Sequence, residues 1–464
     1  MKATIVGHEV LVTIFLLAAA PVSAAPLDKA LAGGDPLPAG VTLRQIDGGP
    51  TYYASNGLTY AAKAGWDNPT LFPIGPWEDM LVSQLDANRW RDLGWNLADT
   101  ITANSSLLIA AANKIWVIQN IGQQRLLPST GTETLGLLAY DEPSTYAEME
   151  TPIATTANSL QDGRFWGVNN TWNFIKFGGL KGAPSPNTSN SVLMGPVKTP
   201  NGTTRHIDVS AIDVYWFTGA QTGFWQYAGG LLHNQGRNMT ADQMARGSNY
   251  GDVISDQRAF TGDAAPIFGI VEDGGPYTTD TSASDYITPP ELNWAIWSEL
   301  IHGARGVVYF NHTFAGPAVS DDNLAEAYYQ TVRPAQTISM YNQVKTTDAL
   351  VKQMASVLNS PTAFNYISVN RPGYQDGKVT SLFSGIEVMA KDNNGQFYIF
   401  TDTRDSMTQS NIPATFTLAD KNATSVAVIG ENRTIAVTNG VFTDTFATAP
   451  TVHIYRVRRQ PHTD

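Results

Sequence analysis

One repeated pattern in residues 66–360 constrains the fold more than any other feature of the chain. A short apolar, strand-like segment is followed by a helical pattern or a polar loop, and this unit occurs eight times. The strands are expected at 71–75, 96–101, 115–120, 134–142, 164–169, 211–216, 265–272 and 306–310. Helical patterns are expected at 80–93, 106–113, 146–160, 289–304 and 323–358. Eight strands that alternate with helices predict a parallel (β/α)8 TIM barrel.

A doubly wound open sheet is the alternative for the same alternation of strands and helices. Such sheets often carry a Gly-x-Gly-x-x-Gly turn after a strand, where a dinucleotide binds. This sequence has no such motif after an expected strand, which favours the closed barrel.

The pattern changes after residue 360, where short strand-like stretches follow one another without helices. Turn sequences such as Asp392-Asn-Asn-Gly395 and Thr438-Asn-Gly440 separate them. About seven short strands in this span predict a β-sandwich. We therefore divide the chain into a signal peptide (1–24), a linker with a hairpin (25–65), a catalytic barrel (66–360) and a C-terminal sandwich (361–464).

The first residues are typical of a secretory signal peptide. Lys2 supplies a positive charge, residues 10–20 are apolar, and Val22-Ser23-Ala24 is a small-residue cleavage site. We therefore expect a secreted or periplasmic protein. The apolar run is too short to span a membrane and no later segment approaches the required length, so we expect no membrane span.

Charge and composition argue against several partners and chemistries. The net charge is -12, and we see no cluster of Lys and Arg, which disfavours nucleic acid as a partner. The chain has no Cys, which rules out disulfides, thiolate metal sites and a Cys nucleophile. Seven scattered His show no metal-ligand spacing, so we predict neither a metal site nor a cofactor. Calcium held by loop carboxylates stays open.

Two of the expected strands end on a carboxylate. Strand four runs into Asp141-Glu142-Pro143, and strand seven runs into Glu272 and Asp273. In a barrel the C-terminal strand ends form the active face. Two glutamates on separate strands suit a glycosidase, in which one protonates the leaving oxygen and the other attacks or activates water.

Other strand ends carry amides, carboxylates and aromatic rings, which is the mixture that sugar-binding sites use. We predict that the following residues bind the substrate: Asp141, Tyr215, Asp99, Asn120, Asn169, Trp172, Trp216, Tyr309, His312 and Trp77. The expected partner is therefore a carbohydrate. The oligomeric state is left open.

Four segments carry a resemblance to a known group of enzymes. They are Leu138-Ala-Tyr-Asp-Glu-Pro143, Asp213-Val-Tyr215, Gly269-Ile-Val-Glu-Asp-Gly274 and residues 294–309. Over roughly residues 70–315 the chain resembles the large clan of retaining (β/α)8 glycoside hydrolases with catalytic glutamates on strands four and seven. The resemblance implies that Glu142 is the acid/base and Glu272 the nucleophile. It also implies that Tyr215 hydrogen-bonds and orients Glu272.

Two positions depart from the pattern of that clan. Asp141 stands where the clan usually has an Asn that binds the sugar 2-hydroxyl, and Asp99 stands near strand two, where an Arg is common. Both changes leave the sugar and the exact family open. The first also leaves room for an altered mechanism.

Competing interpretations remain at this point. A glutamate at a strand end is often a helix cap or an exposed loop charge, and Glu142 precedes a Pro and an expected helix. The main alternative function is a non-catalytic carbohydrate-binding or surface protein on the same barrel. A metal-dependent hydrolase is a third. The sequence has no Gly-x-Ser-x-Gly, His-Glu-x-x-His or P-loop motif to favour other chemistries.

Overall fold

The structure is a computed structural model of the whole chain. It describes residues 36–44, 48–121, 131–145, 147–149, 151, 163–171, 197–198, 204–205, 207–218, 239–261, 265–274, 287–312, 324–329, 335–448 and 450–459. The predicted signal peptide and Trp172 lie outside these residues.

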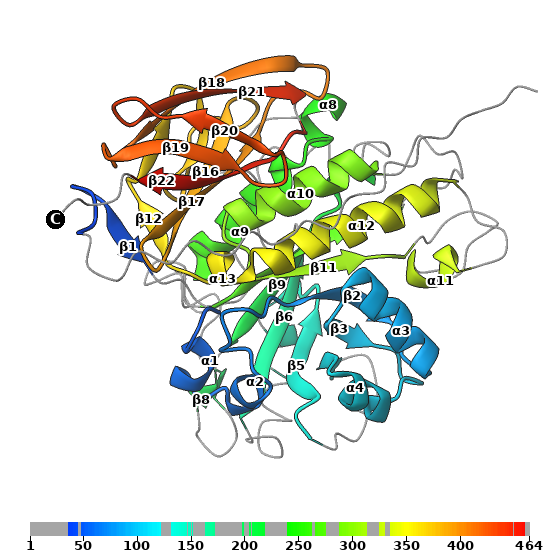
Figure 1. Cartoon of the computed structure of the whole chain (residues 1–464). Helices are drawn as coiled ribbons and strands as arrows, with labels where there is room; N and C mark the ends of the chain where they lie inside the picture. The colour runs from blue at the N-terminus through cyan, green and yellow to red at the C-terminus, as the bar shows by residue number, and fades with distance from the viewer. Residues whose placement is uncertain are drawn as a thin grey trace, which may run out of the picture.

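Eight parallel strands close into a barrel in chain order, so the predicted (β/α)8 fold is confirmed (Figure 1). The strands are β2 (Ile74–Asp79), β3 (Leu97–Ile101), β4 (Trp116–Asn120), β5 (Thr134–Asp141), β6 (Phe165–Thr171), β9 (Val209–Asp213), β10 (Ile267–Glu272) and β11 (Gly306–Phe310). The ladder closes between β11 and β2, where Val308 pairs with Gly75.

Alternating side chains of the strands divide the barrel into two cores. One set fills the interior and includes Phe165, Phe268 and Ile270, while residues of opposite parity such as Val271 pack outward against the helices. Gly136 makes room for the ring of Phe165, because a Cβ there would lie 2.1 Å from that ring. The interior is therefore packed, and only the strand ends are available for a site.

Helices cover the outer face of the barrel strands. They include α3 (Gln84–Leu93), α4 (Leu107–Asn113), α9 (Ser248–Thr261), α10 (Pro289–Ile301) and α12 (Ala335–Gln353). Helix α3 begins with a capping box in which the Ser83 amide donates to Asp86 at 2.7 Å. Helix α10 begins the same way with Thr288 and Glu291, and Pro289 fits its first turn.

Three element boundaries differ from the predicted ones. The first strand lies later in the chain, at 74–79, and the sixth lies earlier, at 209–213. Residues 209–217 form a nearly continuous buried run, and periodicity alone cannot locate the end of a strand in such a run. The long helix expected at 323–358 is divided into α11 (Leu324–Tyr328), α12 and α13 (Ala355–Leu358).

The hairpin predicted within residues 25–65 is wrong. Strand β1 (Thr42–Arg44) pairs instead with β12 (Thr362–Phe364), far away in the sequence. The second half forms two short helices, α1 (Tyr52–Ser55) and α2 (Thr59–Lys63). The apolar side chains Tyr53, Leu58 and Ala61 pack with the barrel interior cluster, and this tertiary contact outweighs local strand propensity.

The C-terminal part is a β-sandwich, as predicted. One sheet has the order β1-β12-β16-β17-β22-β19-β20, with β14 and β15 beside β16, and the other has the order β13-β18-β21. The remaining bounds are β13 (Ile367–Val369), β14 (Pro372–Gln375), β15 (Lys378–Val379), β16 (Ile386–Asn393), β17 (Gln396–Thr403), β18 (Ser410–Leu418), β19 (Ala423–Val428), β20 (Arg433–Ala436), β21 (Val441–Thr448) and β22 (His453–Arg459).

Two turns of the sandwich follow directly from their sequences. Asn394 and Gly395 connect β16 to β17, and Asn439 and Gly440 lie just before β21. All four have positive φ, between 52° and 86°. Asn-Gly suits such two-residue turns, because Asn tolerates the left-handed region and Gly adopts it without strain.

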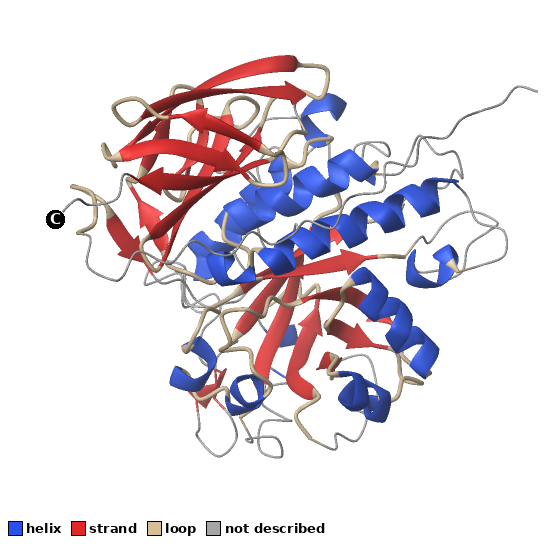
Figure 2. Cartoon of the chain, in the orientation of Figure 1, coloured by secondary structure: helices blue, strands red, loops and turns tan. Residues whose placement is uncertain are grey.

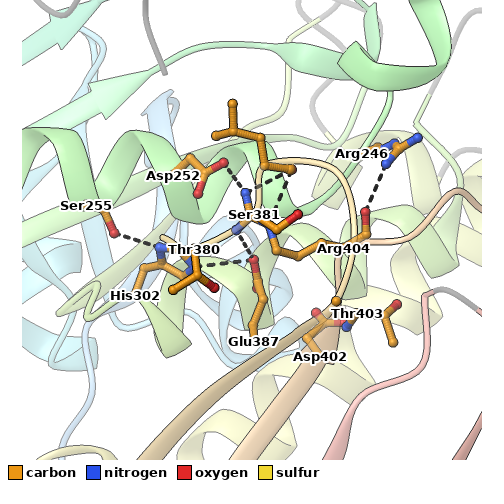
Figure 3. Close-up of polar contacts among 12 residues, drawn as sticks. Arg246, Asp252, Ser255, His302, Thr380, Ser381, Glu387, Asp402, Thr403 and Arg404 are labelled. Atoms are coloured by element: carbon orange, nitrogen blue, oxygen red, sulfur yellow. Dashed lines mark hydrogen bonds and ion pairs between the residues drawn. The ribbon is translucent and has the colours of Figure 1, made fainter. Parts of the chain in front are cut away.

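Helices α9, α10 and α13 lie between the barrel and the sandwich (Figure 2). At this interface a fully buried guanidinium joins the two parts. Arg404, which follows β17, donates to Glu387 of β16 at 2.6 Å and pairs with Asp252 of α9 (Figure 3). His302, after α10, lies 3.3 Å from Glu387 and 2.7 Å from the Ser255 hydroxyl. The network therefore holds two helices of the barrel against one sheet.

Electrostatics within this network favour the ionised form of Glu387 beside the guanidinium of Arg404. Burial alone would raise the pKa of Glu387, but His302 and Arg404 outweigh it and hold the pKa below its usual value. The chain around Arg404 is also fixed by side chains of the barrel. Arg246 donates to the carbonyl of Arg404 at 3.0 Å, and the Trp294 indole donates to the Thr403 carbonyl at 2.7 Å.

Replacing Arg404 tests how strongly this interface stabilises the protein. We expect Arg404→Met to lower the free energy of unfolding by about 3–5 kcal/mol, because it leaves Asp252 and Glu387 buried without their partner. Urea unfolding at pH 7 measures the change. The matched control is Lys345→Met, since Lys345 pairs with Asp92 at the surface, and its cost should stay below about 1 kcal/mol. Similar losses in both variants would contradict the prediction.

Candidate active site

The C-terminal strand ends, which we call the mouth of the barrel, gather carboxyl and amide side chains. Within the last three residues of their strands lie Asp79, Asp99, Asn120, Asp141, Asn169, Asp213 and Glu272. The segments that follow β6, β9, β10 and β11 lie partly outside the described residues. Carboxylates brought together in this way repel each other and raise each other's pKa values, which is common at active sites.

Glu272 ends β10 and is fully buried, with both carboxylate oxygens occupied. Its Oε1 accepts from the Phe217 amide at 2.8 Å and from the Tyr250 hydroxyl at 2.6 Å. Its Oε2 accepts from the Thr218 amide at 3.1 Å and from the Thr218 hydroxyl. These four donors fill the lone-pair positions of a carboxylate.

Burial and hydrogen bonds act on Glu272 in opposite directions. Burial raises its pKa to about 7, while donors from Thr218, Tyr250 and Phe217 favour the charged form and limit the rise. The group therefore changes charge near neutral pH.

The tyrosine that hydrogen-bonds Glu272 is not the expected one. Tyr250 of α9 makes this bond, whereas Tyr215 donates to Asp213 at 3.3 Å. The reason is that strand six lies earlier than predicted. Strand β9 ends at Asp213, so Tyr215 lies two residues after the strand instead of within it. Tyr215 packs against Phe310 with ring centroids 4.7 Å apart.

Glu142 differs from Glu272 in its exposure and in its backbone conformation. It follows β5 directly and is exposed, with its backbone in the left-handed region at φ 51°. Its amide donates to the Asn169 carbonyl at 2.9 Å, which fixes the turn. A non-glycine residue with this φ is strained, and such residues cluster at functional sites.

Two carboxyls end strands close to Glu142: Asp141 ends β5 itself, and Asp213 ends β9, which is separated from β5 by β6. Asp141 accepts from the Asn169 side chain at 2.8 Å. Asp213 is 6% exposed and lies near enough to Glu142 and Asp141 to sense their charges. Burial first, then the charges of Glu142 and Asp141, raise the pKa of Asp213 well above its usual value. The carboxyl of Asp213 is therefore protonated more readily than that of an exposed Asp.

Two further carboxyls at the mouth have raised pKa values. Burial, followed by the charge of Asp141, raises the pKa of Asp99 to about 7. Burial and the charge of Asp79 raise the pKa of Asp273 well above its usual range. Among the described residues, neither oxygen of Asp273 has a hydrogen-bond donor.

Three predicted substrate-binding aromatic residues belong to the core. Trp77 fills the barrel interior, and Trp216 and Tyr309 lie in the outer core between strands and helices. Tyr309 has the same parity as Val307 and donates to Asp348 of α12 at 2.6 Å. These positions do not fit the predicted contacts with a sugar, because a side chain enclosed by core residues offers no surface to one.

The other predicted positions lie at or near strand ends. Asn120 ends β4 and Asn169 lies in β6, both buried. His312 follows β11, is half-buried and lies 3.1 Å from the Trp77 carbonyl. Trp172 lies outside the described residues. A role in binding stays a prediction for Asp141, Asn120, Asn169, Asp99, Tyr215, Trp172 and His312.

Sequence reasoning missed Asp213, Tyr250 and Thr218 as members of the site. Asp213 could have been found, since it is a carboxylate within an expected strand, but the strand end was placed three residues too late. Tyr250 and Thr218 reach the site from a helix and from the turn after β9, and no local pattern signals that approach.

Other kinds of site find little support. Among the described residues, no group of three or more His, Asp or Glu is placed to hold a metal ion. Within the same residues, no helix has the length and apolar content needed to cross a membrane. A cavity of about 410 Å³ lies beside the C-terminus of α10, between α9 and the sandwich, and its walls include Arg258, His302 and Tyr374. It is remote from the strand ends.

Comparison with known proteins adds evidence on the fold. No protein-family model matches the chain, and no curated protein matches it. A solved structure described as a glycoside hydrolase is 9% identical and covers 84% of this chain and 93% of its own, with a TM-score of 0.50. A glycoside hydrolase family 5 structure from Bacteroides vulgatus ATCC 8482 is 9% identical, covering 84% and 90%, with a TM-score of 0.48. At this identity the first likeness shows a shared barrel fold alone.

The variant Asp99→Asn tests whether ionisation of Asp99 destabilises the folded protein. In the unfolded chain an Asp loses its proton near pH 3.9, whereas folded Asp99 keeps it to about pH 7. The wild type therefore loses stability as the pH rises from about 4 to 7. We expect the variant to match the wild type at pH 4 and to exceed it at pH 8, by up to about 4 kcal/mol. Urea unfolding at pH 4, 6 and 8 measures this.

The matched control for this prediction is Asp92→Asn. Burial alone would raise the pKa of Asp92, but hydrogen bonds from Lys345 and Tyr341 outweigh it and lower the pKa. Its amide variant should therefore gain no stability at pH 8. An Asp99→Asn protein no more stable than wild type at pH 8 would show that Asp99 is not held neutral.

Proposed function

We propose that the protein is a secreted glycoside hydrolase that cleaves O-glycosidic bonds of a poly- or oligosaccharide with retention of configuration. The observation that carries the proposal is the convergence of strands four, six and seven, which brings Asp141, Glu142, Asp213 and Glu272 to one barrel mouth. Pairs of carboxyls at such a mouth perform acid/base and nucleophilic catalysis on glycosides.

Glu142 is the acid/base in this proposal. Its exposure and fixed backbone suit a group that must reach a leaving oxygen from the solvent side of the barrel mouth. It protonates that oxygen as the bond to the anomeric carbon breaks, and afterwards it takes a proton from the incoming water.

Glu272 is the nucleophile in the same proposal. Attack on the anomeric carbon needs an ionised carboxylate with one free lone pair. All four acceptor positions of Glu272 are engaged, so one hydrogen bond has to open when the substrate binds. The hydroxyl of Thr218 is suited to this, because it can turn away about χ1, whereas the amides of Phe217 and Thr218 are fixed by the backbone.

The four hydrogen bonds that occupy the carboxylate of Glu272 also favour a second candidate function. A protein whose strand-seven carboxylate never becomes free would bind a glycan at the mouth without cleaving it. Product release that depends on Glu272 would exclude this candidate.

Glu142→Gln and Glu272→Gln test the proposed pair. Each variant should lose at least about 100-fold of the wild-type rate, because one removes the proton donor and the other the attacking carboxylate. The measurement is release of reducing sugar from plant, fungal and bacterial polysaccharides, with circular dichroism as the check on folding.

The matched control is Glu148→Gln, six residues after Glu142. Its carboxylate accepts from the amides of Ser144 and Thr145 at 2.8 and 2.9 Å, outside the proposed pair. This variant should keep wild-type activity. Substantial activity in folded Glu142→Gln and Glu272→Gln would refute the pair. Binding of a polysaccharide by a wild type that releases no sugar would favour the second candidate.

The proposal also predicts a pH dependence. Since burial raises the pKa of Glu272 to about 7, the attacking form is lost below that pH, and kcat/KM should fall there. In Thr218→Val the ionised carboxylate of Glu272 loses one hydrogen-bond donor. Its pKa should therefore rise, and the acidic limb of the kcat/KM profile should move to higher pH. The control is Thr347→Val, the same substitution in α12, where the hydroxyl donates to Asn293 at 2.9 Å. A limb that stays in place in Thr218→Val would contradict the assignment.

A further inference from the structure

We infer that the mouth of the barrel selects an amino sugar, whose unsubstituted ammonium group is bound by Asp141, Asn169 and Asp213. The inference rests on the proposed function and names the substrate class of that same site. Three features of the mouth support it: the sign of its charge, its buried oxygens without donors, and the arrangement of its acceptors on neighbouring strands.

The charged side chains that end the barrel strands have one sign. Carboxyls lie within the last three residues of five of the strands, at Asp79, Asp99, Asp141, Asp213 and Glu272. The described residues that end the barrel strands, and those that directly follow them, include His312 but no Lys or Arg. At the interface with the sandwich, by contrast, buried carboxylates meet the guanidinium of Arg404. A cationic ligand therefore complements the described part of the mouth.

Three buried oxygen atoms at the mouth have no hydrogen-bond donor among the described residues. They are the Oδ1 atoms of Asp99, Asn169 and Asp213. The three residues are 2%, 0% and 6% exposed. They have the same parity along their strands as Leu97, Phe165 and Ala211 of the interior cluster, so their side chains face the barrel axis. Because a buried acceptor without a donor is costly, these oxygens indicate a ligand that donates hydrogen bonds.

Two of these oxygens lie beside Asp141 on successive strands. Asp141 of β5 pairs with Asn169 of β6, and Thr171, two residues further along β6, pairs with Asp213 of β9. Nδ2 of Asn169 donates to Oδ1 of Asp141 at 2.8 Å, and this bond fixes the amide, since an ionised carboxylate can only accept. The Tyr215 hydroxyl donates to Oδ2 of Asp213 at 3.3 Å.

The number of acceptors matches a primary ammonium group. The half-buried carboxylate of Asp141, the Oδ1 of Asn169 and the Oδ1 of Asp213 are acceptors on three neighbouring strands. An ammonium group has three N–H donors, whereas a sugar hydroxyl has one. Hydrogen bonds between an ammonium and a carboxylate are also stronger than those of a neutral donor.

The electrostatics of Asp213 accord with a cationic ligand. Burial first, then the carboxyls of Glu142 and Asp141, raise its pKa well above the usual value, and the Asn169 side chain lowers it. A bound ammonium group favours the ionised form of Asp213, which a hydroxyl or an N-acetyl group does not. A uronic acid or a sulfated sugar adds a further negative charge and is disfavoured.

The first experiment compares glycans that share a backbone and differ in one group on the ring. The β-1,4-linked set consists of the hexamers of glucosamine, N-acetylglucosamine and glucose. The α-1,4-linked set consists of polygalactosamine, its N-acetylated form and the anionic polygalacturonate. We expect the wild type to cleave a free-amine member with a kcat/KM about 100-fold above that of the others in its set, because only the free amine pairs with the carboxylates.

Two outcomes of this comparison separate the inference from the proposed function. A wild type that cleaves a neutral or acidic glycan, in these sets or among the polysaccharides above, as fast as the free-amine glycans overturns the inference alone. A wild type that cleaves no glycan overturns the proposed function, and the inference with it.

The variant Asp213→Asn tests the assigned residues on the amino glycan that the wild type cleaves. It should raise KM about 10- to 100-fold, because a charge-assisted hydrogen bond becomes a neutral one. It should also weaken the rise of KM with NaCl between about 50 and 500 mM, since salt screens the lost charge pair. Asp141→Asn should change both quantities in the same direction. A side chain with a structural role alone does not alter the salt dependence.

The matched control is Asp348→Asn in α12, the same substitution at a fully buried carboxyl on the outer side of the barrel. Asp348 accepts from the Tyr309 hydroxyl at 2.6 Å in the outer core. This variant should keep both KM and its salt dependence, with circular dichroism as the check on folding. Unchanged KM and salt dependence in folded Asp213→Asn and Asp141→Asn would overturn the inference.

Discussion

Closure of the parallel barrel is the constraint on which the site depends. Parallel strands that close in chain order bring all eight C-terminal ends to one edge, whatever residues those ends carry. In this chain the ends carry mostly carboxylates. Asp141 and Glu272 are far apart in sequence, yet closure brings both to the mouth. The packed interior beneath them excludes water from one side and makes their charges costly.

The free-energy cost of these buried charges has to be offset by other interactions. Glu272 is stabilised by two backbone amides and two hydroxyls, and burial raises the pKa values of Asp99 and Asp213 so that both give up their protons less readily. The Arg404 network follows the opposite strategy, because each buried charge there meets a partner of opposite sign. Charges at the interface between barrel and sandwich are therefore neutralised, whereas those at the mouth are left partly uncompensated, a pattern that is common at active sites.

The fold could be predicted because its signals are local and repeated. Apolar strands at regular intervals indicated the barrel, and turns such as Asn394-Gly395 indicated the sandwich hairpins. The hairpin at 25–65 failed because β1 finds its partner in β12, which no local pattern reveals. Glu142 and Glu272 lie at the C-terminal strand ends, where the sequence placed them, and their roles stay predictions. Asp213 was missed because periodicity does not locate the end of a continuous apolar run.

The two glutamates of the proposed pair lie in contrasting surroundings. Glu142 owes its position to a strained turn and faces solvent, with carboxyls as its neighbours. Glu272 owes its position to donors from the turn at 217–218 and from α9, which favour its charge. One carboxyl therefore meets solvent, whereas the other is buried among four hydrogen-bond donors. Under the proposed function the two side chains are chemically identical, so their different roles have to come from this difference in surroundings.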